Sequence, residues 1–176
     1  MGYLRGALRI KKIGHAGTLD PFATGLLIVA VGKCTRMIPF LEKAKKSYVA
    51  KILLGKTSPT LDPESEITDV PLNREKPTKD EIEKIIEEKF IGKITQKPPV
   101  KSSVKRVERE RTVNKFRIKD IDGKVVGFHC DVEAGTYIRK LCHDMGLKLK
   151  TKAHMQQLIR TRVGPFNEEG IVSLLE

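Results

Sequence analysis

The sequence predicts an α+β domain with a mixed, mainly antiparallel sheet flanked by helices. Three observations favour this class. An amphipathic helix begins at Thr78, two apolar segments flank a turn at Asp122-Gly123, and another amphipathic helix covers residues 136–150. Helical and strand periodicities that alternate along one chain of 176 residues are typical of a single mixed domain.

The first third of the chain is expected to alternate between helix, loop and strand. Its glycines and the Asp20-Pro21 pair indicate a turn-rich loop, and the continuous apolar run that follows a glycine indicates a buried strand. Pro39 interrupts the second helical segment. The expected elements are a helix over 3–13, a loop over 14–24, a strand over 26–31, a helix over 35–44 and a strand over 48–54.

Local signals are stronger in the rest of the chain. Thr78 and Glu81 form a capping-box pattern at the start of a helix. Asp-Gly between two strand patterns predicts a hairpin. The expected elements are a polar loop over 56–77, a helix from 78 to 90, strands over 116–121 and 125–132, a helix over 136–150 and a short helix over 152–160. The inward residues expected on the 136–150 helix are Ile138, Leu141, Cys142, Met145 and Leu149.

Charge is the strongest bulk signal. The chain has 34 Lys and Arg against 22 Asp and Glu, a net charge of +12. This balance favours a polyanionic partner, with nucleic acid ahead of an anionic membrane, although a basic protein with solvated lysines fits the composition equally well. Trp is absent, so stacking on bases is expected from one or two placed rings.

The cysteines and the apolar segments exclude several classes. Cys34, Cys130 and Cys142 form no CxxC pair, which fits a reducing cytosol and cysteines that fill space as small apolar side chains. The longest apolar run is far shorter than a membrane span of about 20 residues. We therefore expect a cytoplasmic protein without a membrane or metal requirement. The four histidines show no metal-ligand spacing.

Two apparent motifs carry no chemistry. Gly55-Lys56-Thr57 is similar to the end of a phosphate-binding loop, but Ala50 occupies the position of the required earlier glycine. Cys142 and His143 are neighbours on a helix and point about 100° apart, which does not suit a nucleophile and its base.

The loop over 14–24 is the best candidate for chemistry. Gly14 and Gly17 let the backbone turn tightly, and Pro21 favours extended geometry at Asp20. An aspartate held there, just before a buried strand, can project into a cleft. On the residues alone, an Asp-Pro turn without chemistry is the favoured interpretation.

A family resemblance favours chemistry. Four blocks resemble, in order, the motifs of the TruB/dyskerin family of RNA pseudouridine synthases, and together they span residues 14–166. The blocks are GHAGTLDPFATGLLIVAVGKCTR at 14–36, the aromatic motif at Lys45-Lys46-Ser47-Tyr48, the arginine motif at Gly135-Thr136-Tyr137-Ile138-Arg139 and the C-terminal motif at 158–164.

The resemblance implies a role for each matching residue. Asp20 corresponds to the catalytic aspartate, Tyr48 to the aromatic ring that stacks on the target base, and Arg139 to the arginine that pairs with the aspartate. Tyr137 and Leu158 correspond to pocket-lining residues. His15 corresponds to a histidine that helps to hold RNA with its target uridine flipped out. The reaction needs no cofactor, and we expect the adjacent arginine to lower the pKa of the aspartate by ~1–3 units.

The resemblance also bears on domain organisation and partners. We expect residues 1–176 to form a single TruB-type catalytic domain, without the first strand of the family and without its C-terminal PUA-type RNA-binding domain. Residues 14–68 look like the bacterial stand-alone tRNA enzyme. Residues 96–113 look more like the archaeal and eukaryotic dyskerin-type subunit, which works with a guide RNA and partner proteins.

Residues 97–111 form a candidate phosphate-contact strip. The strip includes the RNA-binding candidates Lys101, Lys105 and Arg106, together with Lys97, Arg109 and Arg111. The alternative is an edge strand whose basic residues pair with Glu108 and Glu110.

Three functions remain open from the sequence: a pseudouridine synthase acting on the T-loop uridine of tRNA, a catalytic subunit of a guide-RNA-directed ribonucleoprotein, and a non-catalytic RNA-binding remnant.

Overall fold

A six-stranded sheet forms the centre of the computed structural model, which describes residues 2–71, 76–99, 105, 107–169 and 171. The strand order is β2-β10-β4-β9-β8-β7. Only the β2–β10 pair is parallel among these neighbours, so the mixed, mainly antiparallel sheet is confirmed. The strands are β2 (Thr24–Gly25), β4 (Lys46–Leu54), β7 (Gly92–Gln96), β8 (Arg109–Asp122), β9 (Val125–Val132) and β10 (Ala153–Val163).

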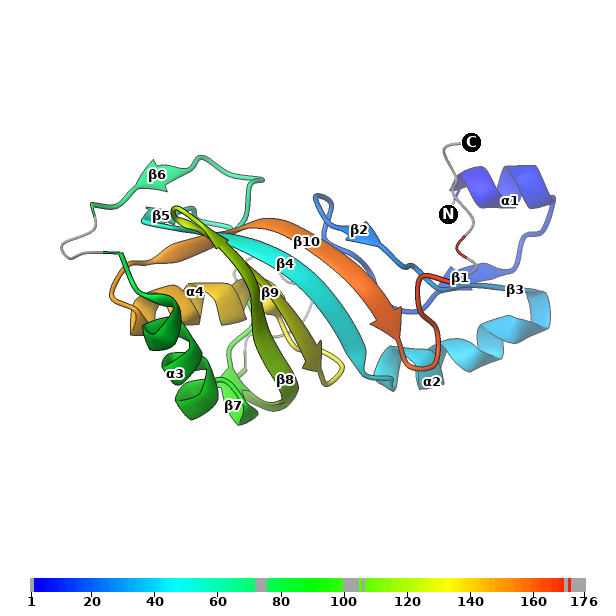
Figure 1. Ribbon diagram of the computed structural model, residues 1–176. Helices are drawn as coiled ribbons and strands as arrows, with labels where there is room; N and C mark the ends of the chain where they lie inside the picture. Colours follow the sequence, from blue (N-terminus) through cyan, green and yellow to red (C-terminus); the bar gives the residue numbers. More distant parts are fainter. Residues whose placement is uncertain (1, 72–75, 100–104, 106, 170, 172–176) are drawn as a thin grey trace.

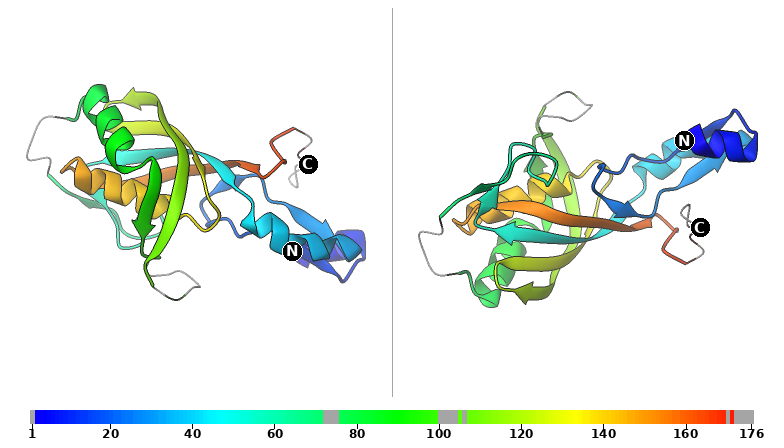
Figure 2. Two further views of the ribbon diagram at one scale, coloured as in Figure 1. Left: turned by 90° about the horizontal axis from the view of Figure 1, so that it is seen from below. Right: turned by 90° about the horizontal axis from the view of Figure 1, so that it is seen from above.

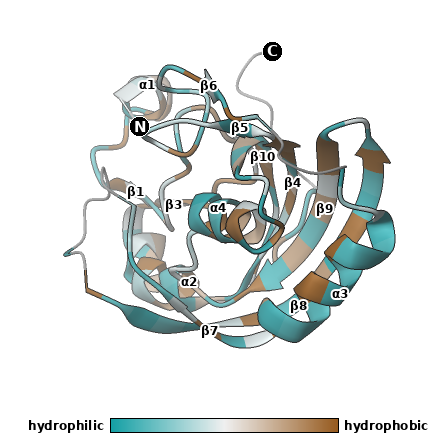
Figure 3. Ribbon diagram, turned by 90° about the vertical axis from the view of Figure 1, so that its left-hand side faces the viewer, coloured by the Kyte–Doolittle hydropathy of each residue, from teal (hydrophilic) through white to brown (hydrophobic). Residues whose placement is uncertain are grey.

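Two helices pack together against this sheet, and Figure 1 shows both beneath it. Helix α3 (Lys79–Lys89) contacts β8, helix α4 (Ile138–Lys148) contacts β10, and the helices contact each other. The predicted capping box of Thr78 and Glu81 is present. Figure 3 shows α4 enclosed by the curved sheet. The five side chains expected to point inward from α4 and its C-terminus are all buried.

An arm formed by the N-terminal segment extends away from the sheet (Figure 2). It contains α1 (Gly2–Leu8), the antiparallel pair β1 (Ile13–His15) and β3 (Val29–Val31), the 3-10 helix η1 (Gly32–Met37) and α2 (Ile38–Lys43). The predicted strand over 26–31 is thus shorter than expected, because Leu26 bonds to β10 instead of continuing β3. Cys34 is exposed, whereas Cys130 and Cys142 are buried as expected.

The predicted hairpin is confirmed. Strands β8 and β9 pair from Asp122 opposite Val125 onward, and Gly123 adopts a positive φ of 58° in the turn. In the loop over 56–77, the described residues form only the short pair β5 (Lys56–Thr57) and β6 (Thr68–Asp69).

The predicted short helix over 152–160 is wrong, because this segment belongs to β10. The local sequence around Gln156 and Gln157 suits a helix, but β10 bonds to β4 along one side and to β2 along the other. Tertiary pairing of this kind overrides a weak local helix preference. Strand β7, at the edge of the sheet, carries no signal that the sequence analysis recognised.

Among the described residues, no helix is long and apolar enough to cross a membrane.

Candidate active site

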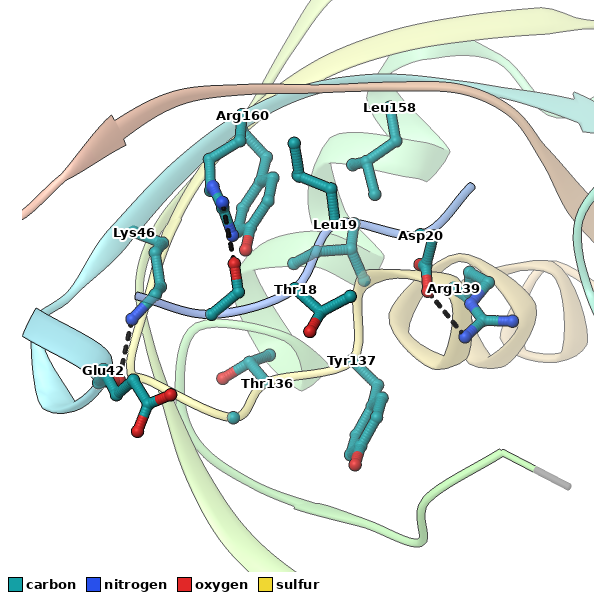
Figure 4. Close-up of a pocket in the computed structure, with 14 residues that line it drawn as sticks. Thr18, Leu19, Asp20, Glu42, Lys46, Thr136, Tyr137, Arg139, Leu158 and Arg160 are labelled. Carbon is teal, nitrogen blue, oxygen red and sulfur yellow. Dashed lines mark hydrogen bonds and ion pairs between the residues drawn. The ribbon is translucent and has the colours of Figure 1, made fainter. Parts of the chain in front are cut away.

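A cavity of about 470 Å³ lies where the Asp20 loop, β4, β10 and the start of α4 meet. Five of the predicted site residues line it together, and Figure 4 shows four of them with labels. These residues are Asp20, Tyr48, Tyr137, Arg139 and Leu158. Four separate segments of the chain therefore converge on one cavity.

The loop that carries Asp20 is fixed at both ends. Before it, β1 pairs with β3, and after it, β2 pairs with β10, where Gly25 lies opposite Arg160. The Asp20 carbonyl accepts a hydrogen bond from the Ala23 amide at 2.9 Å, which closes the Asp-Pro turn. Gly25 has a φ of +95°, and a Cβ there would lie 2.4 Å from the Arg160 carbonyl oxygen. Only glycine permits this close approach.

Arg139 joins two carboxylates. Its Nη2 donates to Asp20 Oδ1 at 2.9 Å, and its Nη1 donates to Asp62 Oδ2 at 2.6 Å. The Arg139 side chain is 11% exposed, that of Asp20 is 31% exposed, and that of Asp62 is fully buried. Asp20 is therefore the carboxylate of this group that reaches the cavity.

The sequence analysis missed Asp62. Its Oδ1 accepts hydrogen bonds from the Thr60 hydroxyl at 2.6 Å and from the Glu64 amide at 3.0 Å, so the carboxylate is locked behind Arg139. A signal was available, since Thr-Leu-Asp-Pro occurs twice, at 18–21 and at 60–63. Both copies deliver an aspartate to the same guanidinium.

The pKa of Asp20 is raised above its ordinary value, contrary to the expectation from its arginine partner. Burial favours the neutral acid most strongly, and the charge of Asp62 adds to that effect. The charge and hydrogen bond of Arg139 lower the pKa of Asp20 without outweighing burial.

Tyr48, Leu158 and Arg160 share one face of the sheet. Tyr48 on β4 lies directly opposite Arg160 on β10, and Leu158 lies two residues before Arg160. Residues two apart on a strand point to the same side. Tyr48 is 9% exposed, and burial raises the pKa of its phenol, which therefore stays protonated at neutral pH.

A side chain that the sequence analysis did not select holds Tyr137. The buried Gln96 donates from Nε2 to the Tyr137 carbonyl at 3.1 Å and accepts at Oε1 from the Tyr137 amide at 3.0 Å. Tyr137 is the N-cap of α4, the helix that carries Arg139. Gln96 thus fixes the backbone at the entrance to that helix.

Two further predicted RNA-binding residues, His15 and Lys105, are not among the residues that line the cavity. His15 is on β1 in the N-terminal arm and is half-buried. Lys105 is exposed, and Lys101 and Arg106 lie outside the described residues.

The basic strip is only partly described. Lys97 and Arg109 are exposed. Glu110 pairs at 2.9 Å with Lys93 on β7. Arg109 and Arg111 pair with β7 on one side, whereas the pairing of β8 with β9 begins only at Val113, so this part of the strip has a strand neighbour on one side.

Comparisons with known proteins place the chain in a family. Residues 5–138 match the model of the TruB family pseudouridylate synthase (N terminal domain), and residues 139–176 match the tRNA pseudouridylate synthase B C-terminal domain. The boundary between these matches falls at the start of α4, and both regions contribute strands to the central sheet.

Curated relatives include two archaeal proteins named "Probable tRNA pseudouridine synthase B". The chain is 43% identical over 172 residues to the protein of Methanosarcina barkeri, a match covering 98% of this chain and 45% of the relative. It is 42% identical over 169 residues to the protein of Pyrococcus horikoshii, a match covering 96% of this chain and 45% of the relative. The chain therefore spans about half the length of these relatives.

Solved structures extend the likeness to the fold. A chain of the "Crystal Structure of a Cbf5-Nop10-Gar1 Complex" superimposes with a TM-score of 0.82 at 40% identity, covering 99% of this chain and 47% of that one. A chain of the "Structure of H/ACA RNP bound to a substrate RNA containing 2'-deoxyuridine" superimposes with a TM-score of 0.74 at 38% identity. This match covers 96% of this chain and 44% of that one. The chain thus has the fold of the pseudouridine synthase class. More narrowly, the chain belongs to the TruB family of pseudouridylate synthases.

Proposed function

We propose that this protein is an RNA pseudouridine synthase whose substrate is the T-loop uridine of tRNA, with Asp20 as the catalytic carboxylate. The observation that carries the proposal is the cavity in which Asp20, its partner Arg139 and the ring of Tyr48 meet. The catalytic unit is a single domain over residues 1–176.

The reaction isomerises one nucleotide without a cofactor. The glycosidic bond from the ribose carbon to N1 breaks, the base rotates, and the same ribose carbon bonds to C5. The hydrogen on C5 leaves as a proton, and N1 gains one, so atoms and electrons balance. Asp20 acts in its ionised form, either by attacking the sugar or by removing a sugar proton to give a glycal.

The other predicted site residues that line the cavity each have a role in this reaction. Arg139 positions the Asp20 carboxylate through a planar guanidinium, a geometry that lysine lacks. Tyr48 replaces the stacking partner that the uracil loses when it leaves the RNA stack. Tyr137 and Leu158 form walls of the cavity.

RNA recognition draws on charge and shape. A net charge of +12 favours a polyanion, and the splayed bases of a T-loop suit recognition by shape. His15 helps to hold the flipped nucleotide, and Lys101, Lys105 and Arg106 contact phosphates. With no disulfide among the described cysteines, the cytoplasm is the proposed compartment.

A second candidate is the catalytic subunit of a guide-RNA-directed ribonucleoprotein. The likeness to a chain of a Cbf5-Nop10-Gar1 complex and to one of an H/ACA RNP favours it. In that case the same cavity performs the same isomerisation, and guide RNA and partner proteins deliver the uridine. The third candidate is a non-catalytic RNA-binding remnant.

Tritium release from 5-tritiated uridine in a tRNA transcript separates these functions, because the C5 hydrogen leaves only if the base is rejoined through carbon. Release by the purified protein alone supports the tRNA enzyme. A transcript with cytidine in place of the T-loop uridine should then release nothing. Release only after guide RNA and partner proteins are added supports the second candidate. RNA binding that weakens with salt, without release in either assay, supports the remnant and contradicts an enzyme.

A further inference from the structure

Arg160 is a buried cation without an acidic partner. It is 1% exposed and is among the largest fully buried side chains of the described residues. Among the residues that the structure describes, no carboxylate lies within ion-pair distance of its guanidinium. Burial of a charge is costly unless hydrogen bonds replace its water, so such a residue calls for a specific role.

The guanidinium of Arg160 bonds to the loop that carries Asp20. Its Nε donates to the Leu26 carbonyl at 2.8 Å, and its Nη2 donates to the Gly17 carbonyl at 3.1 Å. Gly17 lies three residues before Asp20 and Leu26 lies six residues after it. One planar guanidinium therefore bonds to the chain on both sides of Asp20.

The backbone of Arg160 holds the same loop. Its carbonyl accepts from the Leu26 amide at 2.7 Å, and Arg160 is the parallel partner of Gly25. A register shift in the β10–β4 pairing lies between Arg160 and Arg162. Irregularities of this kind aim a side chain in a new direction next to a functional site.

The Arg160 guanidinium also reaches Tyr48. Arg160 lies directly opposite Tyr48 on β4, and its charge lowers the pKa of the phenol against the larger effect of burial. In Figure 4, Arg160 descends from β10 toward the loop, between Lys46 and Asp20. Since its named donors bond to protein acceptors within a buried setting, the geometry suits a positioning residue better than a contact to an RNA phosphate.

We propose that Arg160 is a positioning residue that fixes the Asp20 loop against β10. It thereby holds the Asp20 carboxylate and the Tyr48 ring in the relative positions in which both contact the nucleotide. This inference rests on the proposed activity of Asp20. Displacement of a reacting group by about 1 Å can cost about 100-fold in rate, which sets the scale of the expected effect.

The test compares Arg160→Lys with Arg162→Lys, the same change at an exposed position on the same strand. Single-turnover tritium release at saturating RNA, RNA Kd and amide hydrogen exchange are measured on the full chain. Partner proteins and guide RNA are included if release requires them. Arg160→Lys should slow release by roughly 100-fold with Kd changed less than about twofold, whereas Arg162→Lys should match the unsubstituted protein.

Hydrogen exchange tests the inference independently of activity. In Arg160→Lys, the Ala16, Ala23 and Leu26 amides, which bond within or at the ends of the loop, should exchange faster while amides shared by β4 and β9 stay protected. If the unsubstituted protein releases no tritium, the proposed function fails, and exchange still decides the role of Arg160.

Several results would overturn the inference. Unchanged release and unchanged loop exchange would show that the guanidinium does not position the loop. Equal losses of rate and RNA affinity would make Arg160 an RNA contact. If Arg160→Lys does not fold, Arg160→Gln replaces it, since an amide keeps an N–H donor without a buried charge. Unfolding of both, or faster exchange throughout β4 and β9, would assign Arg160 to general stability.

Discussion

The Arg139 guanidinium lies 2.9 Å from the Asp20 carboxylate, although 119 residues separate the two in the sequence. A second nitrogen of the same guanidinium binds Asp62 at 2.6 Å. Helix α4 thus presents one cation to two aspartates from two copies of Thr-Leu-Asp-Pro. The partly exposed Asp20 is available to a substrate, and the buried Asp62 holds the arginine in place.

Arg139→Lys should lower turnover more than RNA binding. A lysine ammonium cannot present two parallel N–H donors to two carboxylates, so Asp20 loses its fixed orientation while the charge stays. We expect a fall in kcat of about 100-fold with a small change in Kd, measured by tritium release and filter binding. Equal losses in both would make Arg139 a simple RNA contact.

Asp62→Asn should shift the acid limb of the activity profile to lower pH. The charge of Asp62 helps to raise the pKa of Asp20, so its removal lowers that pKa. Because the reaction needs ionised Asp20, activity is present above this pKa and lost as the pH falls through it. The measurement is kcat/KM against pH, with Asp69→Asn at an exposed position as the control. An acid limb that stays in place would show that Asp62 does not influence the titration.

Asp20→Asn should stabilise the fold at neutral pH. The folded-state pKa of Asp20 is raised, mainly by burial, so the folded protein binds the proton more tightly than the unfolded chain. The resulting loss of stability is absent at pH values below the pKa of Asp20 in the unfolded chain. It is complete at pH values above the pKa of Asp20 in the folded protein. Urea unfolding should therefore show a more stable variant at pH 7, and the difference should shrink under acid conditions. A variant that is less stable at pH 7 would contradict this sign.

Gln96→Glu should destabilise the entrance to α4. A carboxylate cannot donate to the Tyr137 carbonyl, and the new charge is buried. Loss of such a buried bond costs about 1–3 kcal/mol. Gln156→Glu, the same change at an exposed position, should alter unfolding by less than about 0.5 kcal/mol. Similar urea midpoints for the two variants would refute the role of Gln96.

The elements that the sequence predicted well depend on local chemistry. The capping box at Thr78 and the Asp122-Gly123 turn specify a helix start and a hairpin through residues that are neighbours in the chain. Strand β10 was missed because its structure depends on pairing with strands far away in sequence. Cavity residues were found through resemblance, since no local pattern brings Asp20 to Arg139.

The electrostatics of the cavity could not be derived from residue types. An arginine next to an aspartate usually lowers the pKa of the acid, but the outcome here depends on burial and on Asp62, whose position only the fold reveals. Arg160 escaped notice for the same reason, because its partners are backbone carbonyls. Such acceptors have no signature in the sequence.

The most direct test is single-turnover tritium release by Asp20→Asn, measured beside its RNA Kd and with guide RNA and partner proteins if the unsubstituted protein needs them. The amide keeps the shape of the side chain and removes its charge. We predict that release is abolished while RNA affinity stays nearly unchanged. Release at a rate near that of the unsubstituted protein would show that the Asp20 carboxylate is not the catalytic group.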